Sequence, residues 1–276
     1  MRISILTLLA MVMTTSLFAQ VDSNFHIYLC FGQSNMQGSA PIEESDTIGN
    51  KRFLVMSPSD FENMNRKQGK WYEAVPPLSQ PWSKLSIADY FGRTMVQKMP
   101  QEVKVGVIVV AIGGSDIRLF DKDIYVDYMN TYPEQWFADQ IGSYGGDPYG
   151  RMVHLAKLAK KQGVIKGILL HQGESNEGDK NWPLYVKKVY NNLLNDLKLS
   201  ADSVPLIAGE VVHADQGGEC APMNPIINTL PATIPTAHVV SSAGCTCLPD
   251  KTHFDTNGVR ELGKRYAEKV IEIQKY

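Results

Sequence analysis

The sequence predicts an α/β fold, a three-layer α/β/α sandwich with a five-stranded parallel sheet. Five apolar runs rich in β-branched residues predict the strands, which occupy residues 25–31, 103–112, 164–170, 205–212 and 238–241. Because these runs are nearly continuous in hydrophobicity, we expect both faces of the sheet to be covered. Helical patterns between and after the runs supply the crossovers that parallel strands need.

Four segments have apolar residues three or four positions apart, as on the buried side of a helix. They lie within residues 85–99, 152–159, 184–197 and 259–273. The last of these patterns follows Asp255 and Thr256, and either side chain can cap the first turn of a helix. The sequence therefore predicts that the chain ends on a helix.

The chain has 276 residues, 43% of them hydrophobic, which is enough to bury one sizeable core. We expect a single domain over residues 20–276. Two long segments, residues 38–83 and 117–148, interrupt the alternation of strands and helices. Loops of this length in a compact domain are usually functional.

The first 19 residues have the pattern of a secretory signal peptide. Arg2 precedes an apolar run at residues 3–13, and small polar residues follow before Ala19. The mature chain is expected to begin near Gln20 and to be secreted or periplasmic. The apolar run is too short to span a bilayer, and no cysteine follows the cleavage point to carry a lipid, so no membrane anchor is expected.

The charge balance argues against a nucleic-acid partner. The formal net charge is −2, and the sequence contains no run of like charges. Such a chain offers no basic patch to hold phosphates.

Four cysteines would enter an oxidising compartment. Cys30 lies within an apolar run and is predicted to be a buried free thiol. We expect one disulfide between Cys220 and either Cys245 or Cys247. A metal site at residues 245–247 is the weaker alternative, because no second Cys or His pair lies at zinc-ligand spacing.

Polar segments follow four of the five predicted strands. In parallel sheets ligands bind at the carboxyl ends of the strands, so these segments are candidate site positions. They are residues 32–36, 112–116 and 171–176, and the loop with residues 250–253.

Ser34 is the candidate nucleophile. It follows a buried strand by three residues, and Gly32 permits the tight turn that exposes such a serine. The segment is not the Gly-x-Ser-x-Gly elbow, because Met36 occupies the place of the second glycine. A lone serine after a strand is usually a helix cap, so its role depends on the residues that join it.

A candidate base stands near the other end of the chain. A serine hydroxyl needs a base within hydrogen-bond reach, and that base needs an acceptor that sets its tautomer. His253 can be the base, with Asp250 three residues earlier as its acceptor. Glu174 is a second carboxylate that can orient His253 instead, and the sequence leaves this choice open.

Acyl transfer also needs donors for the oxyanion of the tetrahedral intermediate. Such a donor is commonly worth about 3 kcal/mol. The Gly113–Gly114 pair can offer a bare backbone N–H, and Gln172 can offer a side-chain amide.

Together these segments resemble the four sequence blocks of the sialate O-acetylesterase-like branch of the SGNH hydrolases. This branch includes the carbohydrate esterase family 6 acetylxylan esterases. The blocks occur in family order across residues 25–260, and they are residues 32–36, 112–115 and 171–175, with Asp250 and His253.

The resemblance implies a flavodoxin-like SGNH hydrolase fold and an acyl-enzyme mechanism without metal or cofactor. By position in the blocks, Ser34 is the nucleophile, His253 the base and Asp250 its partner. The N–H groups of Ser34 and Gly114, with the Gln172 amide, form the oxyanion hole. The implied partner is an acetylated carbohydrate, such as acetylxylan, sialic acid or a related glycan.

One departure from the branch is Asn176, where an aspartate is more common. Two other functions remain open: a catalytically degenerate carbohydrate-binding protein, or a glycosidase with Glu174 and Asp250 as paired carboxylates. Aromatic residues on the two long segments are candidate platforms for sugar rings or else a small auxiliary core, and they include Trp71, Trp82 and Trp136.

Overall fold

Seven strands form one sheet in the computed structural model, which describes residues 21–132 and 134–275. The predicted signal peptide, residues 1–19, and Gln20 lie outside the described residues. The strands are β1 (Phe25–Gly32), β2 (Phe53–Met56), β3 (Trp71–Glu73), β4 (Lys104–Ala111), β5 (Val164–His171), β6 (Leu206–Gly209) and β7 (Ala237–Val240).

The sheet order is β3-β2-β4-β1-β5-β6-β7, and every pairing is parallel except that of β3 with β2. The predicted α/β sandwich with a parallel sheet is therefore confirmed, whereas the count of five strands is wrong. The two additional strands lie in the segment 38–83. They have four and three residues, and β3 is only partly buried, so neither produces a long apolar run.

The α-helices include the four that the sequence predicts. They are α1 (Ser34–Gln37), α2 (Ile87–Lys98), α3 (Tyr125–Asn130), α4 (Gln135–Gly142), α5 (Pro148–Ala159), α6 (Trp182–Leu197), α7 (Asn224–Ile227), α8 (Leu230–Thr233) and α9 (Thr256–Gln274). Short 3₁₀ turns are η1 (Glu44–Thr47), η2 (Glu62–Met64), η3 (Ile117–Phe120), η4 (Glu174–Asn176), η5 (Ala214–Gln216) and η6 (Ala221–Met223).

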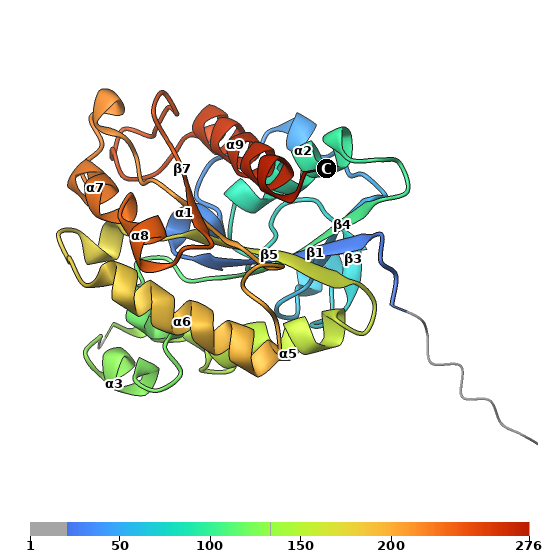
Figure 1. Cartoon of the computed structure of the whole chain (residues 1–276), viewed down its shortest axis with the longest axis horizontal. Coiled ribbons are helices and arrows are strands. Elements are labelled where there is room, and N and C mark those ends of the chain that lie inside the picture. Colours follow the sequence, from blue (N-terminus) through green and yellow to red (C-terminus); the bar gives the residue numbers. More distant parts are fainter. Residues whose placement is uncertain (1–20, 133, 276) are drawn as a thin grey trace, which may run out of the picture.

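Helices cover both faces of the sheet (Figure 1), with α2 and α9 on one face and α5 and α6 on the other. Strand β1 shows why its sequence is apolar throughout. Leu29 and Phe31 point into the core beneath α5 and α6, whereas Tyr28 and Cys30 point into the core beneath α2 and α9. Successive side chains of a strand alternate between faces, so a central strand must be apolar at every position.

The terminal helix α9 begins as the sequence predicts. Of the two candidate caps, Asp255 is the one used, because its carboxylate accepts a hydrogen bond from the Gly258 backbone N–H at 2.8 Å. Such a cap satisfies one of the backbone donors that the first turn leaves unpaired.

Strand β1 lies between β4 and β5, where the chain reverses the direction in which it adds strands. Gly32, the last residue of β1, pairs with Ala111 of β4 and with His171 of β5. The three strands therefore end at the same level of the sheet. The segments after them begin side by side at a topological switch point, the usual place of a ligand site in such sheets.

All four cysteines are free thiols. The expected disulfide between Cys220 and Cys245 or Cys247 is therefore wrong. The Cys220 sulfur lies 4.0 Å from the Glu174 carbonyl oxygen, and the Cys247 sulfur lies 3.8 Å from the Gln216 carbonyl oxygen. Cys245 is buried in the core beneath α9. The three thiols thus occupy separate environments, which spacing along the chain does not reveal.

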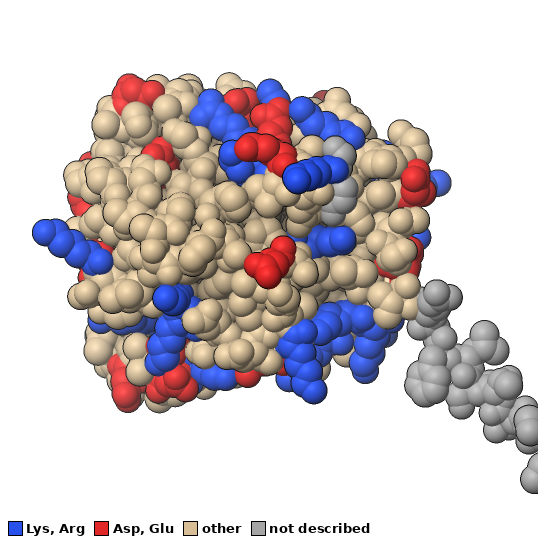
Figure 2. All heavy atoms as spheres, viewed as in Figure 1, with Lys and Arg blue, Asp and Glu red and all other residues tan. Residues whose placement is uncertain are grey.

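Both basic and acidic side chains are scattered over the face drawn in Figure 2, with uncharged surface between them. This mixture agrees with the small net charge. No helix among residues 21–132 and 134–275 has the length and apolar character needed to cross a membrane.

Candidate active site

Ser34 begins helix α1, two residues after the end of β1. The turn depends on Gly32, whose φ is +144° and whose position leaves no room for a side chain. A Cβ there would lie 2.0 Å from the His171 carbonyl oxygen. Only glycine tolerates both conditions, and the backbone can therefore turn directly from the buried strand into the helix. Ser34 itself is half-buried at the mouth of the site.

Ser34, His253 and Asp250 form a continuous hydrogen-bonded chain. The Ser34 Oγ lies 2.9 Å from the His253 Nε2, and the His253 Nδ1 lies 2.8 Å from the Asp250 Oδ2. Because a carboxylate only accepts, the Nδ1 carries the proton in neutral His253. The Nε2 lone pair then faces the Ser34 hydroxyl, which is the arrangement needed for proton abstraction.

Asp250 is held as an acceptor by its own loop. Its Oδ1 accepts hydrogen bonds from the backbone N–H groups of Thr252 and His253, each at 3.0 Å. Partial burial raises the pKa of Asp250, but the hydrogen bonds from His253 and Thr252 outweigh this effect and the net pKa is lowered. Asp250 is therefore the ionised partner of the His253 ring.

Glu174, the other candidate partner, does not contact the His253 ring. Its side chain is only 4% exposed, and its Oε1 accepts a hydrogen bond from the Asn35 amide at 2.7 Å. Burial raises the pKa of Glu174. It lies behind the site, 3.8 Å from the Nε2 of the buried His171.

Asn35 links the parts of the site and was not singled out in the sequence. Its amide nitrogen donates to Glu174 and also to the Thr252 carbonyl oxygen at 3.1 Å. Its amide oxygen accepts from the Phe254 backbone N–H at 3.1 Å. Asn35 thus holds the residues on both sides of His253. The sequence signal was its place directly after the candidate nucleophile, but its partners lie 139 and more than 200 positions away.

Gly113 and Gly114 lie beside Ser34, as expected for strand ends that share one edge. A Cβ at Gly113 would lie 3.8 Å from the Ser34 Cβ. Gly114 has a φ of +72°, and a Cβ there would lie 3.1 Å from the Trp136 ring. The Gly-Gly turn therefore passes between the candidate nucleophile and the Trp136 side chain.

Gln172 lies in a buried network behind Ser34 and does not line the cleft described below. Its amide nitrogen lies within hydrogen-bond distance of Gln33, Ser115 and Asn176, at 3.1, 3.2 and 2.7 Å. Its amide oxygen accepts from the Trp182 indole N–H. The network fixes the orientation of the amide, and its predicted role as an oxyanion donor stays a prediction.

Asn176 belongs to the same network. Its amide nitrogen donates to the Asp116 carboxylate at 2.7 Å, and its oxygen accepts from the Ile117 backbone N–H at 3.0 Å. An aspartate at position 176 would face the buried Asp116 carboxylate directly. The amide at this position, the one departure from the family pattern, therefore fits the acid that this chain places opposite it.

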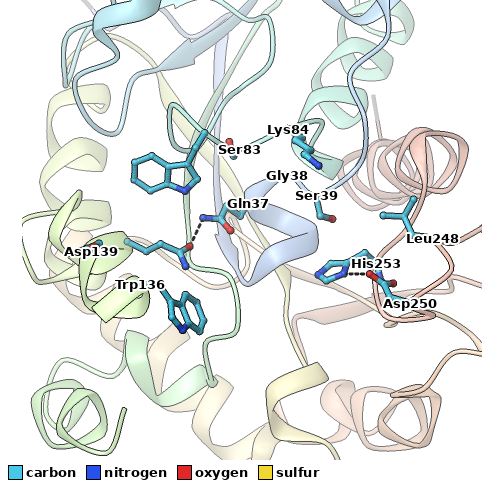
Figure 3. A pocket seen from close by; sticks show the side chains of 12 residues that line it. Gln37, Gly38, Ser39, Ser83, Lys84, Trp136, Asp139, Leu248, Asp250 and His253 are labelled. Atoms are coloured by element: carbon cyan, nitrogen blue, oxygen red, sulfur yellow. Dashed lines mark hydrogen bonds and ion pairs between the residues drawn. The ribbon is translucent and has the colours of Figure 1, made fainter. Parts of the chain in front are cut away.

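A cleft of about 710 Å³ opens beside the Ser34–His253 pair. Figure 3 shows His253 and Asp250 on one side and Trp136 on the other, with Gln37 between them. The lining residues are Gln37, Gly38, Ser39, Trp82, Ser83, Lys84, Trp136, Asp139, Gln140, Leu248, Asp250 and His253. Within the described part of the chain, no group of three or more His, Cys, Asp or Glu side chains is placed to hold a metal ion.

Three solved structures share this fold at low sequence identity. A protein from Arabidopsis thaliana has a TM-score of 0.68 and 20% identity, over 91% of this chain and 99% of its own. NanS has a TM-score of 0.67 and 13% identity, over 93% and 99%. A carbohydrate acetylesterase from Xanthomonas citri has a TM-score of 0.63 and 16% identity, over 90% of this chain and 56% of its own.

A match to a family model assigns the chain to a family, whereas structural likeness at such low sequence identity shows the fold alone. The model described as "Carbohydrate esterase, sialic acid-specific acetylesterase" matches residues 24–272, which include all four sequence blocks. This match confirms the resemblance seen in the sequence. The chain belongs to the carbohydrate esterase family of sialic acid-specific acetylesterases.

Proposed function

We propose that this chain is a secreted serine esterase that removes O-acetyl groups from a carbohydrate through an acetyl-serine intermediate. The observation that carries the proposal is the chain of contacts from Ser34 through His253 to Asp250, at 2.9 and 2.8 Å. Membership of a carbohydrate esterase family supports the ester bond and the sugar.

In the first half-reaction His253 takes the proton of Ser34 while the Ser34 oxygen attacks the acetyl carbonyl carbon. The tetrahedral intermediate then collapses and breaks the bond to the sugar oxygen, which leaves as a hydroxyl after accepting the proton from His253. Asp250 stabilises the imidazolium that exists between these two proton transfers. No cofactor is required for either step.

The backbone N–H groups of Ser34 and Gly114 are the proposed donors to the oxyanion, because the nucleophile and the Gly-Gly turn lie side by side. The Gln172 amide is the third proposed donor. Its N–H groups face Gln33, Ser115 and Asn176 in the free protein, so this contribution requires one of those bonds to open when substrate binds.

In the second half-reaction His253 activates a water molecule, which attacks the acetyl-serine carbonyl carbon. Collapse of the second tetrahedral intermediate breaks the bond to the Ser34 oxygen, which takes the proton from His253, and releases acetic acid, which ionises to acetate in water. Acetylxylan, O-acetyl sialic acid and related glycans are all substrates of the proposed class.

The proposed location is outside the cytoplasm, in the medium or the periplasm, after removal of residues 1–19. The residues from Gln20 onwards would then form the single esterase domain. The N-terminal sequence of the exported protein tests this part, and an exported chain that still carries Met1 would contradict it.

Substitution of the nucleophile tests the proposed chemistry. We expect Ser34→Ala to lower the turnover of p-nitrophenyl acetate by about 10⁴-fold or more and to abolish labelling by a fluorophosphonate probe. Wild-type turnover in Ser34→Ala would overturn the proposal. Glycan binding by the wild type without labelling would favour the catalytically degenerate alternative.

The glycosidase alternative makes the opposite prediction. It requires loss of activity in Glu174→Gln and full activity in Ser34→Ala. The geometry gives it little support, because the Glu174 side chain is buried and does not line the cleft.

A further inference from the structure

Two of the tryptophans on the long segments are exposed in the cleft. Trp82 and Trp136 are 54% and 51% exposed. The other two tryptophans pack into the core: Trp182 is fully buried, and the Trp71 ring lies 4.9 Å from the Phe25 ring. An exposed indole is costly in water unless it has a partner, and both of these line the same cleft as His253.

Trp136 is held in place. Its ring meets the Phe137 ring edge-on, with centroids 5.6 Å apart, and Phe137 is itself buried against Tyr128 and Tyr132. On its other side the indole approaches Gly114. A side chain that is fixed and yet half exposed presents a rigid apolar face at small entropic cost to binding.

The floor between the indoles and the catalytic residues is polar. The Gln37 amide nitrogen donates to the Gln140 Oε1 at 2.8 Å and also to Gln80. The Gln80 amide in turn donates to the Gln140 carbonyl oxygen at 3.0 Å. These bonds tie helix α4, which carries Trp136, to helix α1, which carries Ser34. Gln37 and Gln140 both line the cleft.

We infer that Trp82 and Trp136, with the Gln37–Gln140 floor, form the subsite for the sugar ring that carries the acetyl ester. A pyranose presents C–H faces that pack on indole rings and hydroxyl edges that hydrogen-bond to amides. A long acyl chain suits this cleft poorly, since it would remove water from Ser83, Lys84 and Asp139 without replacing their hydrogen bonds. The inference rests on the proposed esterase function.

The test compares an acetylated sugar with an ester that has no sugar and no aromatic ring. Release of acetate from xylose tetraacetate and from ethyl acetate is measured, and the ratio of the two kcat/KM values is taken for each variant. We expect Trp82→Ala and Trp136→Ala each to lower this ratio about tenfold, mainly through KM for the sugar. Trp136→Phe should keep most of the ratio, because it retains an aromatic face.

The matched control is Leu184→Ala. Leu184 lies on α6, is 57% exposed and is not part of the cleft. The ratio of the two kcat/KM values for Leu184→Ala should equal that of the wild type. Butyrate esters provide the contrasting arm, because a change in the preference for butyrate over acetate in the tryptophan variants would identify an acyl pocket instead.

An unchanged ratio in both tryptophan variants would overturn the inference, whether the two kcat/KM values stay at the wild-type level or fall equally. Either result leaves the esterase proposal standing if Ser34→Ala remains inactive on both esters. Full activity in Ser34→Ala would instead overturn the function itself, whatever the tryptophan variants do.

Discussion

At the scale of single residues, buried amides organise the site more than charged groups do. The Asn35 side chain is fully buried and holds the loop on both sides of His253. Its hydrogen bonds to the Glu174 carboxylate, the Thr252 carbonyl oxygen and the Phe254 N–H satisfy polar groups beside the site. Asn35, the residue next to Ser34, therefore positions His253 within hydrogen-bond distance of the Ser34 hydroxyl.

Removal of this link is expected to affect catalysis more than binding. Asn35→Ala leaves Glu174, the Thr252 carbonyl and the Phe254 N–H without their partner. We expect kcat to fall by about 10²-fold with KM little changed, because His253 loses its fixed distance from Ser34. Steady-state kinetics on p-nitrophenyl acetate, at a temperature where circular dichroism shows a folded variant, is the measurement. A rise in KM with unchanged kcat would contradict this role.

At the scale of elements, the site is built where short turns after neighbouring strands bond to one another. The turn η4 after β5 is joined to the segment before η3, after β4, by the bond from Asn176 to Asp116. Asp116 also forms an ion pair with Arg118, at 2.6 Å, and caps η3. These polar contacts connect two segments that share no backbone ladder, so we expect their loss to weaken the connection between the turns around Gln172.

Asn176→Asp tests this link, with a defined pH dependence. Two buried carboxylates would then face each other, so the pKa of one is raised in the folded protein above its unfolded value. Such a group costs no stability when it is protonated in both states, and the cost grows as the pH rises above the unfolded pKa of about 4. We expect the free energy of unfolding of Asn176→Asp to be about 1–3 kcal/mol lower than that of the wild type at pH 7, and this difference should shrink toward pH 4.

Urea unfolding of the wild type and of Asn176→Asp across this pH range is the measurement. Asn191→Asp is a suitable control, since Asn191 is exposed on α6 and introduces the same charge into water. If Asn176→Asp lowers the free energy of unfolding by the same amount at pH 4 and pH 7, repulsion between the new carboxylate and Asp116 is not the cause of the loss.

At the scale of the whole molecule, two apolar cores on either side of the sheet hold the fold without covalent cross-links. The core beneath α2 and α9 includes Cys30 and Cys245, and no disulfide joins any of the four thiols. Burial raises the pKa of the Cys245 and Cys220 thiols to about 11. These two thiols therefore remain protonated and unreactive near neutral pH.

We expect the melting temperature to be the same with and without dithiothreitol. A native disulfide typically contributes about 2–5 kcal/mol, so the loss of one would be visible. Titration with a chromogenic disulfide reagent should find four thiols in denaturant and a slow reaction in the native protein. Fewer than four thiols, or a lower melting temperature under reducing conditions, would show that a bridge forms.

The sequence alone predicted the features that depend on local patterns. The α/β class, the central strands and the helix that begins after Asp255 follow from hydrophobic periodicity and capping, which neighbouring residues determine. The strands β2 and β3 were not predicted, because four and three residues are too few to show a periodic pattern of hydrophobicity. The resemblance to the family blocks predicted that Ser34, His253 and Asp250 act together, because such motifs consist of residues with a shared chemical role.

The tertiary structure decided every choice between partners distant in the chain. It placed Asp250 rather than Glu174 on the His253 ring and left Cys220, Cys245 and Cys247 unbridged. It also distinguished the exposed Trp82 and Trp136 from Trp71, which is partly buried against the core. The physical reason is that burial, hydrogen-bond geometry and sulfur separation depend on how distant segments pack, and no local pattern contains that information.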